Sequence, residues 1–263
     1  MGRSLIGGLI NNGYPPEQIS GTDINPKQRE LTVSRFGIEV LDDNAQAVND
    51  ADVVVLGVKP QMIRTTLTPL REALAKSRPL LLSIAAGVRL KDIARWSGEE
   101  LPIVRVMPNT PALVSTGAAA LYANNHVTDS QHDIAETIMR SVGITIWLDN
   151  EELIDVVTAL SGSGPAYYFY FMETMEKAGV ALGLTKEQSR LLTLQTALGA
   201  AKMALESNDD PEILRKQVTS PGGTTEKALE VFLDNKMEEM ISKAIQAAFN
   251  RSQELAKLLG EEK

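Results

Sequence analysis

Residues 51–58 have the sequence Ala51-Asp52-Val53-Val54-Val55-Leu56-Gly57-Val58. A run of aliphatic residues without polar alternation is typical of a strand that is buried on both faces of a parallel sheet. Similar apolar runs occur on either side of it, so the expected strands are residues 19–22, 53–58, 80–84, 103–106, 118–122 and 145–148. Amphipathic stretches separate them, and the expected helices are residues 27–36, 63–74, 90–96 and 129–142. This alternation predicts βαβ units and a largely parallel sheet.

The second half of the chain has long helical stretches and little strand signal. The expected helices are residues 151–160, 165–179, 186–207, 211–218 and 226–259. The sequence therefore predicts an α/β fold, in which a Rossmann-like, doubly wound sheet domain at residues 1–150 precedes an all-α domain at residues 151–263. Apolar stripes on several of these helices exceed what one such domain can bury by itself. They favour a homodimer that is joined through the helical domain.

Composition excludes several kinds of function. The 263 residues carry a formal net charge of −8, whereas a nucleic-acid-binding face requires an excess of basic residues. The chain contains no cysteine, which excludes disulfides, thiolate nucleophiles and cysteine–zinc sites. Its two histidines, His126 and His132, lack metal-binding spacing, so no metal is expected. No apolar run approaches the roughly 18 residues of a membrane span, and a cytoplasmic protein without a membrane partner is expected.

The run Val218-Thr219-Ser220-Pro221-Gly222-Gly223-Thr224-Thr225 predicts a helix end, a tight turn and a new helix. Pro221 moves the preceding residue out of the α region, and the two glycines let the backbone turn. Thr224 or Thr225 is expected to cap the new helix. Free N–H groups at such a helix start, with hydroxyls beside them, suit a small carboxylate. The alternative is an ordinary corner between two helices.

Together with four other motifs, this run resembles the signature of pyrroline-5-carboxylate reductases, the last enzymes of proline biosynthesis. The four are Val58-Lys59-Pro60, Ser83-Ile84-Ala85-Ala86-Gly87, Met107-Pro108-Asn109-Thr110-Pro111 and Leu160-Ser161-Gly162-Ser163-Gly164-Pro165-Ala166. Each is weak alone, but the five occur in the family's order across nearly the whole chain. The resemblance implies reduction of 1-pyrroline-5-carboxylate to L-proline with NADPH, or with NADH. It also implies a homodimer with interlocked helical domains, which some members assemble into a homodecamer.

The residues expected to bind the dinucleotide follow strands, where a doubly wound sheet places its ligand. Asp23 stands where an acidic residue holds a ribose hydroxyl, which would favour NADH, whereas Asn25 and Lys27 would receive the 2′-phosphate of NADPH. A turn residue is the alternative for Asp23 and Asn109, and a solvated side chain is the alternative for Lys59. The resemblance adds Asn44 near the adenosine ribose. The other expected cofactor residues are Val58, Lys59, Pro60, Ala85, Ala86, Gly87 and Asn109.

The first eight residues, Met1-Gly2-Arg3-Ser4-Leu5-Ile6-Gly7-Gly8, predict a helix where a Rossmann domain is expected to open with a strand and a glycine turn. In the resembling family that strand ends in Gly-x-Gly-Asn-Met-Gly. Met1-Gly2 matches its last two positions, so Gly2 is counted with the cofactor residues. The sequence is therefore expected to lack the central strand and most of the pyrophosphate loop, and to bind a dinucleotide weakly. A start assigned too late in the gene is the preferred explanation, and residues that were removed or are disordered are the alternatives.

For the substrate, the resemblance implies that the carboxylate rests on the N–H groups of Gly223 and Thr224, in a loop that includes Ser220 and Gly222. Thr225 is implied to hydrogen-bond the ring nitrogen and is the expected catalytic residue. Reduction of a cyclic imine needs a hydride at carbon and a proton at nitrogen, and that nitrogen is basic enough to require no strong acid. Positioning then supplies most of the catalysis.

Three other functions stay open. A β-hydroxyacid dehydrogenase shares the domain order and the Ser-Gly-x-Gly region, but it places a catalytic lysine soon after that region. Here the first lysine after Pro165 is Lys177. A non-catalytic dinucleotide-binding regulator is expected to have a degraded substrate loop, and residues 220–225 are intact. A related imine reductase is the third alternative.

Overall fold

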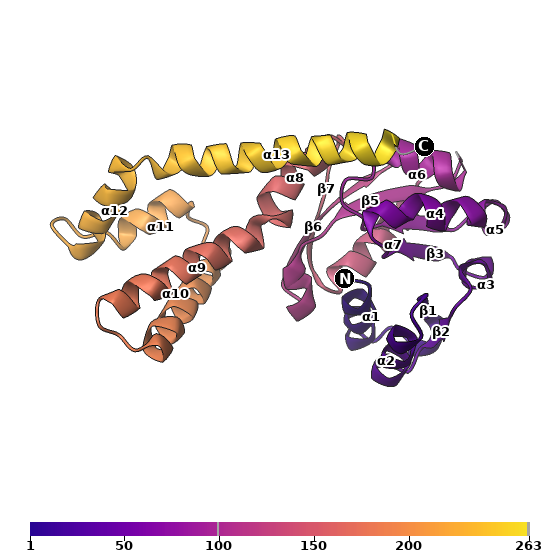
Figure 1. The fold of residues 1–263 in the computed structure, drawn as a ribbon, viewed down its shortest axis with the longest axis horizontal. Coiled ribbons are helices and arrows are strands. Elements are labelled where there is room, and N and C mark those ends of the chain that lie inside the picture. The colour runs from indigo at the N-terminus through magenta and orange to yellow at the C-terminus, as the bar shows by residue number, and fades with distance from the viewer. Residues whose placement is uncertain (99, 262–263) are drawn as a thin grey trace. The chain divides into compact units, whose positions relative to one another are not determined.

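The computed structural model describes residues 1–98 and 100–261, which form two compact units (Figure 1). Unit 1 comprises Met1–Ser163 and the stretch that begins at Ala248, and unit 2 comprises Gly164–Ala247. The chain therefore leaves unit 1 at Ser163 and returns to it at Ala248. The α/β fold class is confirmed, with helices alone in unit 2. The expected division at residue 150 stays a prediction, and the end of the chain belongs to the unit that contains the sheets.

The strands of unit 1 form two sheets. One has the order β1-β2 and the other the order β3-β4-β5-β6-β7. Neighbouring strands are parallel except β5 and β6, which are antiparallel. The bounds are β1 Ser20–Thr22, β2 Glu39–Leu41, β3 Val53–Leu56, β4 Leu80–Ser83, β5 Ile103–Met107, β6 Gly117–Ala123 and β7 Gly143–Trp147.

Local signals explain where several helices of unit 1 begin. The Asn25 side chain accepts a hydrogen bond from the N–H of Lys27, and Pro26 occupies the first position of α2. Thr128 and Gln131 form a capping box at the start of α7. The bounds are α1 Gly2–Asn11, α2 Pro26–Phe36, α3 Asn44–Asn49, α4 Ile63–Leu67, α5 Arg71–Ser77, α6 Leu90–Ser97, α7 Asp129–Arg140 and α8 Leu153–Val157.

The structure corrects three expectations about these elements. The single helix expected at residues 63–74 is divided by a 3₁₀ turn at Thr68–Leu70, because Pro69 has no N–H to donate. The helix expected at residues 226–259 is two helices, since Lys236 between them adopts a left-handed conformation with φ 53°. Strand β2 and helix α3 were not expected, because three and six residues are too short to show a clear period.

The core of unit 1 lies on both faces of the larger sheet. Strand β4 is buried along its whole length, and so is β5. Alternate residues of a strand point to opposite faces, so Leu81 and Leu82 contribute to different apolar clusters. The cluster that contains Leu81 also includes Leu259 from the end of α13, which fixes this part of α13 on unit 1.

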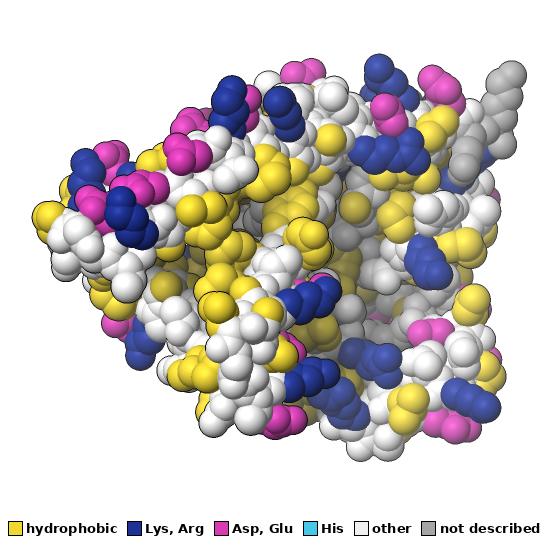
Figure 2. All heavy atoms as spheres, turned by 60° about the vertical axis from the view of Figure 1, so that its left-hand side comes forward, with side chains coloured by type: hydrophobic (Ala, Val, Ile, Leu, Met, Phe, Trp, Pro, Cys, Tyr) yellow, Lys and Arg dark blue, Asp and Glu magenta, His cyan; other side chains and the backbone are white. Residues whose placement is uncertain are grey.

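Unit 2 consists of α9 Gly164–Ala181, α10 Lys186–Glu206, α11 Pro211–Gln217, α12 Thr224–Asp234 and the first part of α13 Met237–Glu261. Its described residues include no buried hydrophobic side chain. Apolar side chains instead lie exposed on α9 and α10, for example Tyr168, Phe169, Leu191 and Leu198. Figure 2 shows hydrophobic side chains gathered on one face of the molecule. Such a surface is typical of helices that are buried by another protein chain. No helix in the described ranges combines the length and apolar character needed to cross a membrane.

The two sheets of unit 1 each have an edge strand with a neighbour on one side only. β1 pairs with β2, and β3 pairs with β4. A strand that paired with both β1 and β3 would join the two sheets into one. Val55 of β3 is 37% exposed, although β4 beside it is fully buried, so the edge at β3 has apolar surface left to cover.

We expect an apolar strand and a glycine turn, added before Met1, to raise both the melting temperature and the affinity for NADPH. The added strand would be buried in the sheet and would extend the loop at the start of α1. Thermal unfolding and fluorescence titration of NADPH on residues 1–263, with and without the extension, measure both effects. A glycine-serine extension of the same length is the control and should change neither. Equal values for the apolar and the control extensions would contradict the prediction.

Candidate functional site

The expected cofactor residues follow three neighbouring strands. Val58, Lys59 and Pro60 come after β3, Ala85 to Gly87 after β4, and Asn109 after β5. These three strands are adjacent and parallel, so the residues after them lie at the same edge of the sheet. Ala85 and Gly87 are buried, whereas Ala86 between them is exposed. The structure thus brings small residues together at the edge where a doubly wound sheet binds its ligand.

The start of α1 lies beside the end of β3. A Cβ atom placed on Gly57 would be 3.9 Å from the Cα of Gly2. The first turn of α1 has no acidic side chain and no side-chain cap, so its first N–H groups are left for another acceptor. A helix start of this kind attracts phosphate groups, and the residues present therefore fit the pyrophosphate of a dinucleotide.

The residues expected around the adenosine ribose follow β1 and β2. An Asp23 carboxylate oxygen accepts a hydrogen bond from the N–H of Asn25 at 2.8 Å, so Asp23 also acts as the turn residue of the alternative interpretation. The side chain of Asn25 caps α2 by accepting from the N–H of Lys27 at 3.0 Å. Lys27 itself is exposed. Asn44 is the first residue of α3, whose cap is Asp43.

Asn109 uses both ends of its amide within unit 1. Its Oδ1 accepts from the N–H of Ala118 at 2.9 Å, and its Nδ2 donates to the carbonyl of Ser161 at 3.2 Å. The amide therefore joins the start of β6 to the π-helical turn Thr158–Gly162. These contacts give Asn109 a structural role that differs from the turn residue expected as the alternative, and its cofactor role stays a prediction.

The substrate loop of unit 2 forms the expected turn and helix start, with one correction. Gly223 is the cap residue of α12, so the expectation that Thr224 or Thr225 caps this helix is wrong. The two threonines occupy the first two positions of α12, because the chain becomes helical directly after the turn at Gly222, where φ is 71°. Glu226 completes the turn by accepting the N–H of Gly222 at 2.7 Å.

The N–H groups of this loop differ in their availability. That of Gly223 donates to the carbonyl of Ser220 at 3.0 Å, so the turn already uses it. Those of Thr224 and Thr225 belong to the first turn of α12, where the helix provides no acceptor. For a substrate carboxylate in this loop, the N–H groups of Thr224 and Thr225 are therefore better donors than the expected pair, Gly223 and Thr224. Thr225 is half-buried, and Ser220 is exposed.

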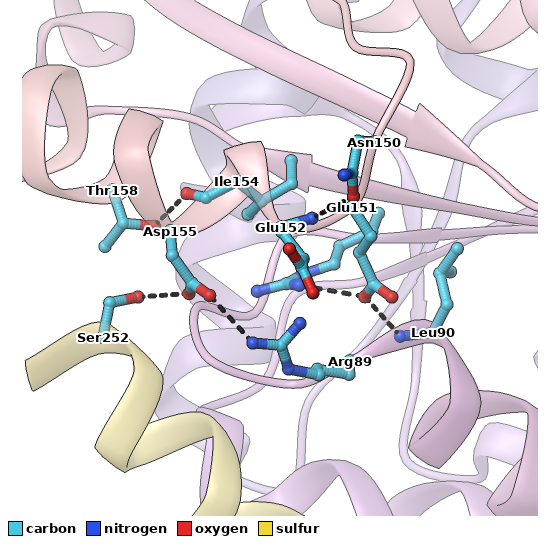
Figure 3. Close-up of polar contacts among 10 residues, drawn as sticks. Arg89, Leu90, Asn150, Glu151, Glu152, Ile154, Asp155, Thr158 and Ser252 are labelled. Carbon is cyan, nitrogen blue, oxygen red and sulfur yellow. Dashed lines mark hydrogen bonds and ion pairs between the residues drawn. The ribbon is translucent and has the colours of Figure 1, made fainter. Parts of the chain in front are cut away.

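Sequence reasoning missed a cluster of charged side chains in unit 1, in which Asp155 and Arg105 are buried (Figure 3). Arg89 donates to Asp155 at 2.9 Å, and Arg105 donates to Glu151 at 2.9 Å. Burial lowers the pKa of the Arg105 guanidinium below its ordinary value, and the charge of Glu151 opposes this shift. A charged residue inside an otherwise apolar run, as Arg105 is within Ile103–Met107, is the signal that would have revealed the cluster.

Comparison with known proteins identifies the class and then the family. Residues 1–87 match the family model described as NADP oxidoreductase, coenzyme F420-dependent. With the strand ends and helix start described above, this match indicates an oxidoreductase that uses a nicotinamide dinucleotide. Residues 151–255 match the model described as pyrroline-5-carboxylate reductase dimerisation. The chain belongs to the pyrroline-5-carboxylate reductase family, because curated relatives of that name match nearly its whole length at 42–50% identity.

Individual relatives agree with this assignment along the whole chain. The pyrroline-5-carboxylate reductase of Pseudomonas aeruginosa is 50% identical over 99% of this chain and 95% of its own length. The structure of the Coxiella burnetii reductase matches with a TM-score of 0.93 and 45% identity, over 97% of this chain and 94% of that one. The Plasmodium falciparum pyrroline carboxylate reductase with NADP bound matches with a TM-score of 0.86 and 30% identity, over the same shares.

We expect Asn109→Ala to lower the free energy of unfolding by about 1–3 kcal/mol, because the N–H of Ala118 loses its partner. Urea unfolding measures this loss, and NADPH titration of the folded fraction measures the affinity. If the amide is structural, the affinity per folded molecule stays within about threefold of the wild-type value. A tenfold weaker affinity with unchanged stability would assign the amide to the cofactor instead.

Proposed function

We propose that this protein reduces 1-pyrroline-5-carboxylate to L-proline with a hydride from NADPH or NADH, the final step of proline biosynthesis. The full-length match to reductases of this name carries the proposal. The intact loop at the start of α12 supports it, because this loop provides the N–H groups and hydroxyls that a small cyclic carboxylate requires.

In this proposal the substrate carboxylate binds the N–H groups of Thr224 and Thr225, with the Ser220 hydroxyl as a further donor. Gly222 and Gly223 keep the turn free of side chains. The Thr225 hydroxyl hydrogen-bonds the ring nitrogen and orients the imine. Since the imine nitrogen is basic, the loop has only to hold it in place while it is protonated, and orientation supplies most of the rate.

The cofactor binds at the edge formed by the ends of β3, β4 and β5. When bound, its reduced nicotinamide supplies the hydride. Ala85, Ala86 and Gly87 form a close-fitting wall for the nicotinamide ring, and Val58 to Pro60 line the dinucleotide. We favour NADPH, because one Asp23 oxygen is engaged in the turn at Asn25 while Lys27 is exposed beside it, ready for a 2′-phosphate.

The helical unit joins two copies of the chain in a homodimer. The match of residues 151–255 to a dimerisation family and the exposed apolar side chains of α9 and α10 support this assembly. Membership of the family also favours assembly of five such dimers into a decamer. It favours a location in the cytoplasm as well. Light scattering distinguishes the masses of a dimer and a decamer.

A β-hydroxyacid dehydrogenase is the second candidate, and the geometry of Lys177 weighs against it. Lys177 is exposed on α9 and forms an ion pair with Glu173. The hydrogen bond to Glu173 raises the pKa of Lys177 above its ordinary value, which makes this lysine a poorer proton donor near neutral pH. A ketone reductase requires such a donor, whereas a cyclic imine does not.

We expect the purified protein, with the apolar strand and glycine turn added before Met1, to oxidise NADPH when 1-pyrroline-5-carboxylate is added, with formation of proline. Absorbance at the nicotinamide band measures the rate, and amino-acid analysis identifies the product. 2-Hydroxyacids and 3-hydroxyacids with the oxidised cofactor serve as comparison substrates. Activity with a hydroxyacid and none with the imine would replace this proposal by the second candidate.

We expect Thr225→Ala to lower kcat about two- to tenfold, which corresponds to one neutral hydrogen bond of about 0.5–1.5 kcal/mol, with unchanged NADPH affinity. Gly223→Ala is expected to raise KM for the imine, because its Cβ would lie 2.9 Å from the Ser220 carbonyl oxygen and force the loop to shift. Thr219→Ala is the control, since the Thr219 hydroxyl donates to the Arg215 carbonyl outside the proposed contacts. An unchanged kcat per folded Thr225→Ala enzyme would remove Thr225 from the reaction.

A further inference from the structure

The buried charged cluster joins three segments of unit 1 that are far apart in the sequence. Asp155 of α8 has a fully buried side chain and accepts two hydrogen bonds. One comes from Arg89, which precedes α6, at 2.9 Å, and the other comes from the hydroxyl of Ser252 in α13 at 2.6 Å. Figure 3 shows these two donors reaching Asp155 from different elements. One carboxylate therefore fastens the start of α6 and the last part of α13 to α8.

A second carboxylate holds the next residue of the same segment. Glu151 accepts from the N–H of Leu90 at 2.7 Å, so it caps α6 from a distant part of the sequence. The same oxygen accepts from Arg105 of β5 at 2.9 Å. Glu151 and Asp155 are separated by about one helical turn of sequence. That short stretch consequently fixes both Arg89 and Leu90, the residues that end the connection from β4 to α6.

The connection itself packs against α13. Gly87 has a φ of 76°, and a Cβ atom placed on it would lie 3.2 Å from Leu259 and 3.9 Å from the backbone nitrogen of Ala256. Both of these α13 residues are buried. The segment of residues 85–90 is thus held by α8 through hydrogen bonds and by α13 through close packing. Its first three residues are the proposed nicotinamide wall.

The chain passes between the two units twice, and both passages lie next to the residues of this cluster. The outward passage follows α8 and the π-helical turn to Ser163, and the return passage enters unit 1 at Ala248. The Ser252–Asp155 hydrogen bond joins these passages within unit 1. Within unit 1, the polar atoms that hold the nicotinamide wall therefore also hold the two stretches where the chain leaves and re-enters this unit.

Stability does not explain why charged groups occupy this place. A buried ion pair is often no more stabilising than apolar residues of the same volume, because both charges lose their hydration. Nη2 of Arg105 is buried without a hydrogen-bond partner among the described residues, which adds to this cost. Directional bonds do, however, fix the position of a loop more narrowly than apolar contacts. Hydride transfer is sensitive to such positions, since a displacement of about 1 Å can lower a rate about a hundredfold.

We propose that Asp155 is a positioning residue for hydride transfer, which it serves by holding Arg89 and Ser252 together and so fixing residues 85–87 relative to the two passages of the chain. The inference rests on the proposed function. Asp155 touches neither cofactor nor substrate, and its effect reaches the reaction through the loop after β4. Loss of its charge should therefore slow the chemical step more than it weakens the binding of NADPH.

Asp155→Asn tests this, because it keeps the shape of the side chain and removes the negative charge with which Arg89 pairs. We expect kcat to fall about tenfold or more, with NADPH affinity within about threefold of the wild-type value. The isotope effect with NADPH deuterated at the transferred position should rise, because hydride transfer becomes slower relative to the other steps. A loss of stability alone would not change this isotope effect.

Asp92→Asn is the matched control. Asp92 is also buried and also pairs with an arginine, Arg95, at 2.9 Å. It also lies beside α13, since a Cβ atom placed on Gly260 would be 2.8 Å from its carboxylate. Its side chain, however, holds neither Arg89 nor Ser252. We expect Asp92→Asn to lower the melting temperature but to leave kcat and the isotope effect per folded enzyme unchanged.

Ser252→Ala provides a second test if Asp155→Asn does not fold, because it removes one hydrogen bond and leaves the Arg89 pair in place. It should lower kcat about threefold and raise the isotope effect, and Ser252→Thr, which restores a hydroxyl, should recover most of the rate. Wild-type kcat and isotope effect in the folded Asp155 and Ser252 variants would overturn the proposal. An inactive wild-type protein that carries the apolar strand and glycine turn before Met1 would instead contradict the proposed function.

Discussion

The hydrogen bonds of Glu151 and Asp155 are the constraint on which the arrangement of unit 1 depends. These two carboxylates receive Arg105 from the sheet, Arg89 and Leu90 from the start of α6, and Ser252 from α13. The stretch of chain that provides them comes directly before the passage into unit 2. The short stretch from Glu151 to Asp155, where α8 begins, consequently relates the sheet, the loop after β4 and the returning end of the chain to one another.

The two units bury their apolar side chains to different extents. Unit 1 encloses β4 and β5 between apolar clusters on both faces of its sheet, so its fold depends largely on its own residues. Unit 2 has a buried Ser189 at the contact of α9 with α10 and leaves large apolar side chains such as Tyr168 and Leu198 exposed. Its match to a dimerisation family supports self-association, and such apolar surface is typical of helices that another chain covers.

The proposed chemistry suits a protein that has few candidate acids. An imine nitrogen accepts a proton readily, so the protein contributes mainly the placement of two reactants. In the proposed function, the small residues after β4 face the nicotinamide ring, and the N–H groups at the start of α12 bind the carboxylate. The N–H of Gly223 is not available to the carboxylate, because it already donates to the carbonyl of Ser220. Under the proposal above, the carboxylate of Asp155 affects the rate from a distance, by holding the loop after β4.

The sequence by itself determined the fold class, the family and most of the elements, because periodicity and motifs such as Ser220–Thr225 are local signals. It also placed Val58, Ala85 and Asn109 at strand ends, which parallel pairing brings to one edge. Only the tertiary structure decided that Asn109 is bonded at both ends and that Gly223 caps α12. Asp155 and Ser252 are 97 residues apart, and no local pattern relates them. Their hydrogen bond exists because both helices pack on the same sheet, and such contacts depend on the whole fold.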